Sequence, residues 1–252
     1  GVLLRSKARW ITDGEKISKY FCSLEKRNYI SKHMSKLVRD NNTIIEDQKE
    51  IEQEVKAFYE NLYKHRNTKD SAIESLISTI PKISKEEQHL IDGEITIEEA
   101  GKALKNMQNG KSPGTDGFTA EFFKFFRKQI GHFVVRSLNE AYEDGELSST
   151  QKEGLIICLP KGDKKREYIK NWRPVTLLNV VYKIGSACIA SRIKTVLPKL
   201  ISEDQTGFMT NRYIGDNIRL IYDLINYLNI KKAPGLLLCI DFEKAFDSLS
   251  WN

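Results

Sequence analysis

The stretch Leu236-Leu-Leu-Cys-Ile-Asp241-Phe-Glu-Lys-Ala-Phe246-Asp247 decides how the rest of the chain is interpreted. A short, continuous apolar run such as 236–240 is typical of a strand that is buried on both faces of a sheet. The run ends at the carboxylate of Asp241. Capping of a following helix is the simplest role for an Asp in this position. The alternative is a magnesium ligand, because magnesium prefers carboxylates and keeps water and substrate phosphates in its remaining positions. A phosphatase could also use Asp241, but it would favour a second Asp where Glu243 stands.

The composition sets broad limits on the class of protein. The 252 residues are 40% hydrophobic, so they can form a core in one large or two small domains. The formal net charge of +6 permits a polyanionic partner without requiring one. The four cysteines form no Cys-x-x-Cys pair, which argues against zinc and favours a reducing, intracellular setting. No apolar run is long enough to span a membrane and no targeting signal is visible, so we expect a nuclear or cytoplasmic protein without a membrane partner.

Local signals predict alternating helices, hairpins and polar loops. The expected helices begin near Asp13 and Asp47 and cover 84–90, 96–109, 120–127, 130–143, 180–196 and 214–228. Hairpins are expected over 36–45 and from the pairing of 154–160 with 171–178, and a final strand over 236–241. Residues 64–75 are expected to form a loop. Pro198 is expected to end its helix, and Ser202-Glu-Asp-Gln205 is expected to cap another.

Two polar segments are candidates for binding phosphates. The loop Lys111-Ser-Pro-Gly-Thr-Asp-Gly117 is dense in turn residues. Gly110-Lys111-Ser112 is not a phosphate-binding P-loop, because Lys105 stands where that motif needs Gly and Pro113 follows at once.

The hairpin over 161–173 is the second segment and carries six cations, with Tyr168 and Trp172 between them. Its six basic residues are Lys161, Lys164, Lys165, Arg166, Lys170 and Arg173. Such a run is either a solvated hairpin tip or a grip on phosphates, in which aromatic faces stack on bases. Both interpretations stay open from the residues alone.

The order of these segments resembles the reverse transcriptases of non-LTR, LINE-type retrotransposons. Five motifs carry the resemblance: Asn109-Gly-Lys-Ser-Pro-Gly-Thr-Asp-Gly-Phe118, Ile156-Ile-Cys-Leu-Pro-Lys161, Asn171-Trp-Arg-Pro-Val-Thr-Leu-Leu-Asn179, Gln205-Thr-Gly-Phe208 with Arg212 and Asp216-Asn217-Ile218, and Asp241-Phe-Glu-Lys-Ala-Phe-Asp247. The segments Arg5–Trp10 and Gly14–Phe21 resemble the connector ahead of the polymerase in these proteins.

The resemblance implies an α+β fold with the fingers and the start of the palm of a right-hand polymerase, preceded by a mainly helical N-terminal extension. The implied domains are a helical connector over 1–90, which would follow an endonuclease, fingers over 91–235 and a first palm strand over 236–252.

The implied activity is RNA-directed DNA polymerisation, with an RNA template, a DNA primer, deoxynucleoside triphosphates and two Mg²⁺ ions. Asp241 would be the catalytic residue and would bind Mg²⁺ together with the carbonyl of Phe242, while Phe246 would exclude the 2′-hydroxyl. Lys161 and Arg173 would hold the incoming nucleotide. Template contacts are implied for Lys111, Ser112, Gly114, Asp116, Gly117, Gln205, Gly207, Phe208 and Arg212.

The second catalytic motif of this family, aromatic-x-Asp-Asp, would lie after Asn252. We therefore expect the parent protein to be a polymerase and the 252-residue chain alone to be inactive. Other interpretations remain: an RNA-binding remnant without catalysis, a scaffold that binds proteins through its helical N-terminal third, and a group II intron maturase. The connector motif at 5–21 favours the LINE type over the maturase.

Overall fold

A computed structural model describes residues 23, 33–64, 70–162, 164–242, 245 and 247. The helix expected near Asp13 and both connector motifs lie outside these residues. The chain divides into two compact units, Gly1–Lys64 with Ile156–Thr176 and His65–Leu155 with Leu177–Asn252. Each unit is described by itself. The domain boundaries expected at 90 and 235 remain predictions.

The first unit begins with the predicted short hairpin. Strand β1 (Leu37–Val38) pairs antiparallel with β2 (Ile44–Ile45), so that Leu37 faces Ile45. Helix α3 (Gln48–Leu62) follows, and the side chain of Asp47 caps it by accepting from two backbone N–H groups of the first turn.

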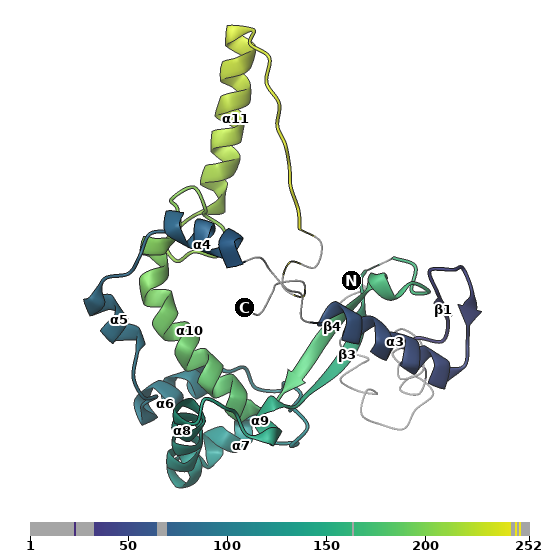
Figure 1. Ribbon diagram of the computed structural model, residues 1–252, viewed down its shortest axis with the longest axis vertical. Helices are drawn as coiled ribbons and strands as arrows, with labels where there is room; N and C mark the ends of the chain where they lie inside the picture. Colours follow the sequence, from purple (N-terminus) through teal and green to yellow (C-terminus); the bar gives the residue numbers. More distant parts are fainter. Residues whose placement is uncertain are drawn as a thin grey trace, which may run out of the picture. The chain divides into compact units, whose positions relative to one another are not determined.

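Strands β3 (Gly154–Pro160) and β4 (Trp172–Leu178) form the second predicted hairpin (Figure 1). Trp172 is only 2% exposed, and its indole N–H donates to the carbonyl of Arg166 at 2.8 Å. It packs in a cluster with Met34, Leu37, Ile45 and Ile51. The buried indole therefore joins the base of the basic hairpin to β1, β2 and α3 within this unit.

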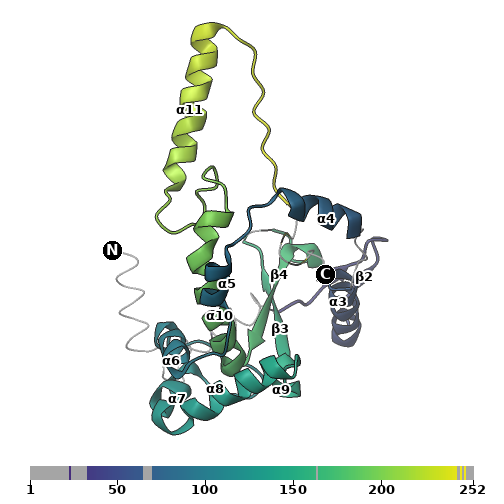
Figure 2. The same ribbon diagram turned by 60° about the vertical axis from the view of Figure 1, so that its left-hand side comes forward.

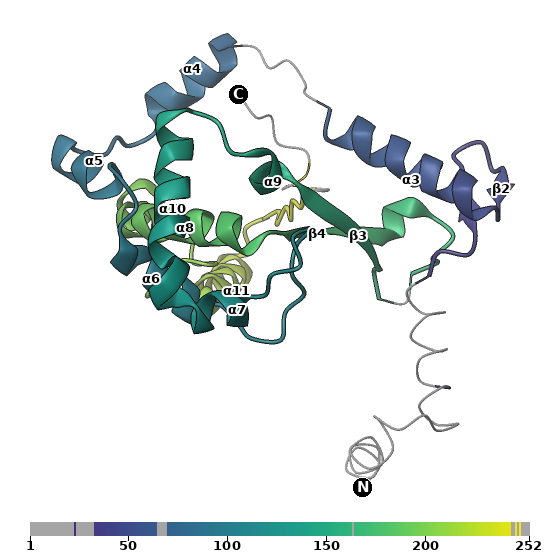
Figure 3. The same ribbon diagram turned by 90° about the horizontal axis from the view of Figure 1, so that it is seen from below.

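The second unit contains mainly helices. In chain order these are α4 (Asp70–Thr79), α5 (Lys85–Ile91), α6 (Ile97–Asn106), α7 (Ala120–Phe125), α8 (Arg127–Glu143), α9 (Ser149–Lys152), α10 (Val180–Leu200) and α11 (Ile214–Lys231). Helix α10 packs against α5, α6 and α8, and α6, α7 and α8 lie together beside it (Figures 2 and 3). Ala100, Leu104, Phe123, Leu138 and Ile184 are among the buried residues of this core.

Two features fix how these helices meet. A Cβ at Gly185 of α10 would lie 2.8 Å from a methyl group of Leu138 of α8, so the Leu138 side chain packs directly on the glycine and would have to move if a larger residue stood there. Arg192 of α10 donates to both carboxylate oxygens of Glu99 at 2.7 and 2.8 Å, and to the carbonyls of Gly93 and Glu94 at 2.6 Å. Because Glu99 also completes the capping box with Thr96, one arginine joins α10 to the beginning of α6.

Several predicted boundaries are wrong. Helix α4 begins at Asp70, inside the segment expected to be loop, and α6 ends at Asn106 instead of near Asn109. Helix α10 continues through Pro198 to Leu200. The predicted capping box at Ser202 is a turn, in which the Ser202 hydroxyl and the backbone N–H of Asp204 interact at 3.5 Å. Helix α9 was not predicted, although Ser148 and Gln151 form a capping box there.

The segment predicted as the final strand is extended but unpaired. Among the described residues no strand lies against it, and Leu236, Leu237, Leu238 and Ile240 are exposed (Figure 2). Helix α11 likewise has no buried residue. A strand needs hydrogen-bonding neighbours along its edges, and the described residues supply none.

Candidate nucleic-acid interface

The loop between α6 and α7 is held by contacts at both ends. Gly110 and Gly117 adopt positive φ angles of 70° and 74°, which permits the two sharp turns. The backbone N–H of Gly110 donates to the carboxylate of Glu121, and this bond lowers the pKa of Glu121 from its usual value. Lys124 of α7 donates to the carbonyl of Met107 and the side chain of Asn109, both at 2.6 Å. The loop is therefore fastened to the helix that follows it.

Asn179 fixes the middle of the same loop. It lies between β4 and α10 and is only 3% exposed. Its Oδ1 accepts from the backbone N–H of Asp116 at 3.3 Å and lies 3.4 Å from the hydroxyl of Thr115, and its Nδ2 donates to the carbonyl of Thr150 at 2.7 Å. A Cβ at Gly114 would lie 2.6 Å from the backbone carbon of Leu178, so the loop approaches this backbone as only glycine can. The sequence analysis did not assign Asn179 to the site.

These contacts show which side chains of the loop are available to a ligand and which residues only shape its backbone. Lys111 and Ser112 are exposed at the surface of the loop. The carboxylate of Asp116 accepts from the backbone N–H of Phe118 at 3.0 Å, which makes a local turn. Gly114 and Gly117 shape the backbone. Of the five residues expected in this loop, only Lys111 and Ser112 present side chains with no turn-forming role.

The loop after α10 is organised around Arg212. Its guanidinium donates to the carbonyls of Ser202 and Gln205 and, at 3.2 and 3.0 Å, to those of Pro198 and Ile201. The bond to Pro198 satisfies a carbonyl in the last turn of α10, which the end of a helix leaves without a partner, and the other three hold the loop that follows the helix. The structure therefore supports a positioning role for Arg212, and its contact with a template remains a prediction.

The same loop projects an aromatic ring. Phe208 is fully exposed and adopts a φ of 62°, a region that non-glycine residues rarely occupy. Gln205 is exposed and Gly207 is partly buried. Strained backbone at an exposed ring is typical of functional loops.

Two cations of the basic hairpin in the first unit, Arg173 and Lys161, are expected to bind the nucleotide, and they differ in their contacts. Arg173 is exposed, and its guanidinium makes neither a hydrogen bond nor an ion pair within the described part of the chain. Lys161 donates to the carbonyl of Lys170 at 2.8 Å across the hairpin. The expectation that Trp172 can stack on a base is wrong, because its indole is buried. Tyr168 is partly exposed, with the Lys170 ammonium 5.6 Å from its ring centre.

Asp241 and Phe242 lie at the end of the unpaired segment and both are exposed. Phe246 lies outside the described residues. Among the residues that the structure describes, no group of three or more His, Cys, Asp and Glu could hold a metal ion. A magnesium ion needs several fixed oxygen ligands, so the described residues do not form a magnesium site.

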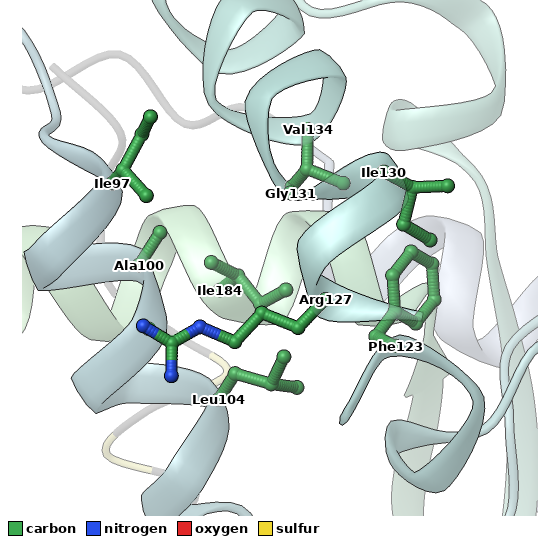
Figure 4. Close-up of a pocket in the computed structure, with 10 residues that line it drawn as sticks. Ile97, Ala100, Leu104, Phe123, Arg127, Ile130, Gly131, Val134 and Ile184 are labelled. Atoms are coloured by element: carbon green, nitrogen blue, oxygen red, sulfur yellow. The ribbon is translucent and has the colours of Figure 1, made fainter. Parts of the chain in front are cut away.

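Two hollows of the second unit are lined by predicted residues, one of about 490 Å³ by Arg212 and one of about 300 Å³ by Asp116, whereas other hollows of this unit lie away from them. One of about 670 Å³ lies between α5, α8 and α10, where Tyr142, Asn139 and Arg192 already bond to other residues of this unit. Another, between α6, α7 and α8, holds about 20 Å³ (Figure 4). That volume suffices for about one water molecule and excludes a larger ligand. No described helix is long and apolar enough to cross a membrane.

Comparison with known proteins gives the class of the chain. Residues 159–252 match the family described as "Reverse transcriptase (RNA-dependent DNA polymerase)". The matched region begins in β3 and includes the basic hairpin, α10, the Arg212 loop, α11 and Asp241.

The relatives are proteins of mobile elements. The chain is 36% identical over 98% of its length to the "Transposon TX1 uncharacterized 149 kDa protein" of Xenopus laevis, of which it covers 19%. It is 23% identical over 63% of its length to the "Probable RNA-directed DNA polymerase from transposon BS" of Drosophila melanogaster, of which it covers 18%. It is 22% identical to the "RNA-directed DNA polymerase from mobile element jockey" of the same organism, again over 63% of its length and over 17% of that protein.

The expected resemblance to the reverse transcriptases of non-LTR retrotransposons is confirmed, because residues 159–252 match the reverse transcriptase family and the chain is similar to proteins of three transposons. The chain spans about a fifth of the length of the relatives it matches. The expectation of a mixed fold of helices and strands is confirmed.

Proposed function

We propose that this chain supplies the fingers and the first palm segment of an RNA-directed DNA polymerase, which adds deoxynucleotides to a primer 3′-hydroxyl along an RNA template. The observation that carries the proposal is the family match over 159–252, which includes Lys161, Arg173 and Asp241. The relatives from transposon BS and jockey are named as polymerases of this kind.

The geometry of the fingers loops supports this role. Phosphoryl transfer depends mainly on alignment and charge neutralisation, so an enzyme needs rigid backbone that presents cations. The Lys111 loop meets this need, because Asn179, Glu121 and Lys124 fix its backbone while Lys111 stays exposed. Template contact by Lys111 and Ser112 and triphosphate contact by Lys161 and Arg173 are the roles that we propose.

For the palm segment, we propose that Asp241 and the carbonyl of Phe242 become magnesium ligands in the longer protein and that Phe246 excludes ribonucleotides. When bound, magnesium would supply positive charge beside the triphosphate. The remaining oxygen ligands would have to come from outside the described residues, because no acidic cluster exists within them. The apolar run 236–240 would then pair as a strand, which would cover side chains that are exposed in this chain.

Substitution of Asp241 in the longer protein tests the proposal. Asp241→Asn keeps the shape of the side chain and removes its charge, so primer extension on poly(rA) should be lost while RNA binding stays largely unchanged. Asp223→Asn is the matched control, because Asp223 only pairs with Arg219 on the exposed surface of α11, at 3.1 Å. Wild-type extension by the Asp241 variant would contradict the proposal. A wild-type longer protein that binds RNA but never extends a primer would favour the RNA-binding remnant.

A further inference from the structure

Four phenylalanine rings form a continuous row from the Lys111 loop to the end of α7. The ring centres of Phe118 and Phe122 lie 4.6 Å apart, those of Phe122 and Phe126 5.0 Å, and those of Phe126 and Phe125 4.8 Å. We call these four residues the phenylalanine ladder. The ladder begins immediately after Gly117, so it continues the loop for which we propose template contact.

The ladder is open to solvent at both ends. Phe125 is 80% exposed, and Phe118 and Phe126 are exposed as well, while Phe122 is partly buried. Phe123, between them in sequence, instead points into the core beside Leu104 and Ile184 (Figure 4). Phe122 packs against this core, and the rings of Phe118 and Phe122 lie 6.3 and 5.5 Å from that of Phe123. Packing on the core therefore accounts for the inner side of the ladder but not for the exposed rings of Phe125 and Phe126.

The charge around the ladder is positive. Residues 118–128 contain Lys124, Arg127 and Lys128 but only one acidic residue, Glu121. The Glu121 carboxylate is occupied by the backbone N–H of Gly110. Arg127 extends across α6, where a Cβ at Gly101 would lie 2.7 Å from its guanidinium carbon (Figure 4). Lys128 is exposed and makes no ion pair within the described ranges.

From this arrangement we propose that the phenylalanine ladder is a binding surface for single-stranded nucleic acid, on which unpaired bases stack while the exposed Lys128 neutralises a phosphate. Exposed rings beside cations are the features that sequence-tolerant single-strand binders combine. An acidic protein surface would use the cation and an apolar protein surface would use the ring faces, whereas single-stranded nucleic acid uses both. The inference extends the proposed function, because the ladder would guide the template strand next to the Lys111 loop.

Binding of fluorescein-labelled oligo(U) to the 252-residue chain, measured by anisotropy without primer, nucleotide or metal, tests the ladder. Loss of one stacked base should raise the Kd of Phe125→Ala by about fivefold or more. Phe125→Leu, which keeps an apolar side chain without a ring, should bind as weakly, and Phe125→Tyr should restore binding. Lys128→Ala should instead lower the slope of log K against log salt by about one.

Tyr222→Ala is the matched control, since Tyr222 is a similarly exposed aromatic residue on α11 and stacks on no other ring among the residues that the structure describes. It should bind like the unaltered chain. Unchanged binding by Phe125→Ala, or equal losses in Phe125→Ala and Tyr222→Ala, would overturn the proposal, as would a Phe125→Ala variant that changes only self-association. Since the assay involves no catalysis, failure of the proposed polymerase activity would show separately, in the Asp241 experiment.

Discussion

Asn179 shows how one buried amide can set the geometry of a functional loop. Its oxygen interacts with the loop near Asp116, and its nitrogen donates to Thr150, residues that are 63 and 29 positions away. A buried polar group of this kind stabilises only when its bonds are complete, because its partners lose their water on folding. The residue therefore couples the Lys111 loop to the junction between β4 and α10.

We expect Asn179→Ala to lower the free energy of unfolding by about 1–3 kcal/mol, because the carbonyl of Thr150 and the N–H of Asp116 would both lose a buried partner. Urea denaturation of the 252-residue chain measures this change. Thr115→Ala removes two long contacts of an exposed side chain, 3.4 Å to Asn179 and 3.5 Å to Glu153, and should stay within about 0.5 kcal/mol. Equal stability of the two variants would show that Asn179 does not anchor the loop.

The ion pair of Glu99 and Arg192 should make the free energy of unfolding depend on pH. Hydrogen bonds from Arg192, with those from Thr96, lower the pKa of Glu99 from 4.5 to about 2. A carboxyl group whose folded pKa is lowered stabilises the fold fully above its unfolded value and loses this contribution as pH falls through the folded value. The contribution of Glu99 should therefore decline between pH 4.5 and about 2.

Comparison of the unaltered chain with Glu99→Gln across this pH range measures the contribution. We expect a difference in unfolding free energy of at most roughly 3 kcal/mol above pH 4.5, which shrinks as the solution is acidified. Glu140→Gln is the control, because the pair of Glu140 with Arg136 is exposed and such pairs contribute little. A difference that does not vary with pH would exclude the ionised pair as its source.

At the scale of elements, the beginnings of several helices were predictable and some helix ends were not. Asp47, Ser84 and Thr96 cap their helices through bonds to neighbouring residues, so the signal is contained in a few positions. The end of α10 depends instead on Arg212, which reaches back to the carbonyls of Pro198 and Ile201. The general rule that proline ends a helix considers only neighbouring residues, so it does not include the hydrogen bonds from Arg212.

The apolar run 236–240 illustrates the same limit for strands. Its composition predicts a buried strand, but a strand also requires partners, and none lies within the described residues. Burial of the run thus depends on which other segments are present, and the sequence of the run alone cannot show this.

We expect Leu238→Lys to leave the unfolding free energy of the 252-residue chain within about 0.5 kcal/mol, because Leu238 is 72% exposed. Ile184→Ala, in the core between α6, α8 and α10, should cost about 2–5 kcal/mol. Urea denaturation distinguishes the two. A loss for Leu238→Lys as large as that for Ile184→Ala would mean that the run is buried in solution, against the exposure described above.

At the scale of the whole molecule, the motifs identified the family and the loops, but not how their residues are used. The Lys111 loop, the basic hairpin and the Arg212 loop are where the motifs indicated, yet Trp172 and Arg212 hold structure together. Motifs record which residue types recur in order along a chain. Whether a residue stabilises the fold or offers its side chain to a ligand depends on its burial and hydrogen bonds. These depend in turn on partners that are distant in sequence.

The described residues contain no cluster of acidic groups, so we expect that the 252-residue chain does not extend a primer. We still expect the chain to bind RNA. The sequence contains no Asp-Asp pair, and within the described residues Asp241 belongs to no group of three metal-binding side chains. Divalent cations need several fixed oxygens before they can align a triphosphate. Incubation with primed poly(rA), deoxythymidine triphosphate and Mg²⁺ or Mn²⁺ should give no extended product, while anisotropy shows RNA binding that weakens as salt is raised. Product that forms with this chain and disappears in Asp241→Asn would show that Asp241 acts without the expected second pair.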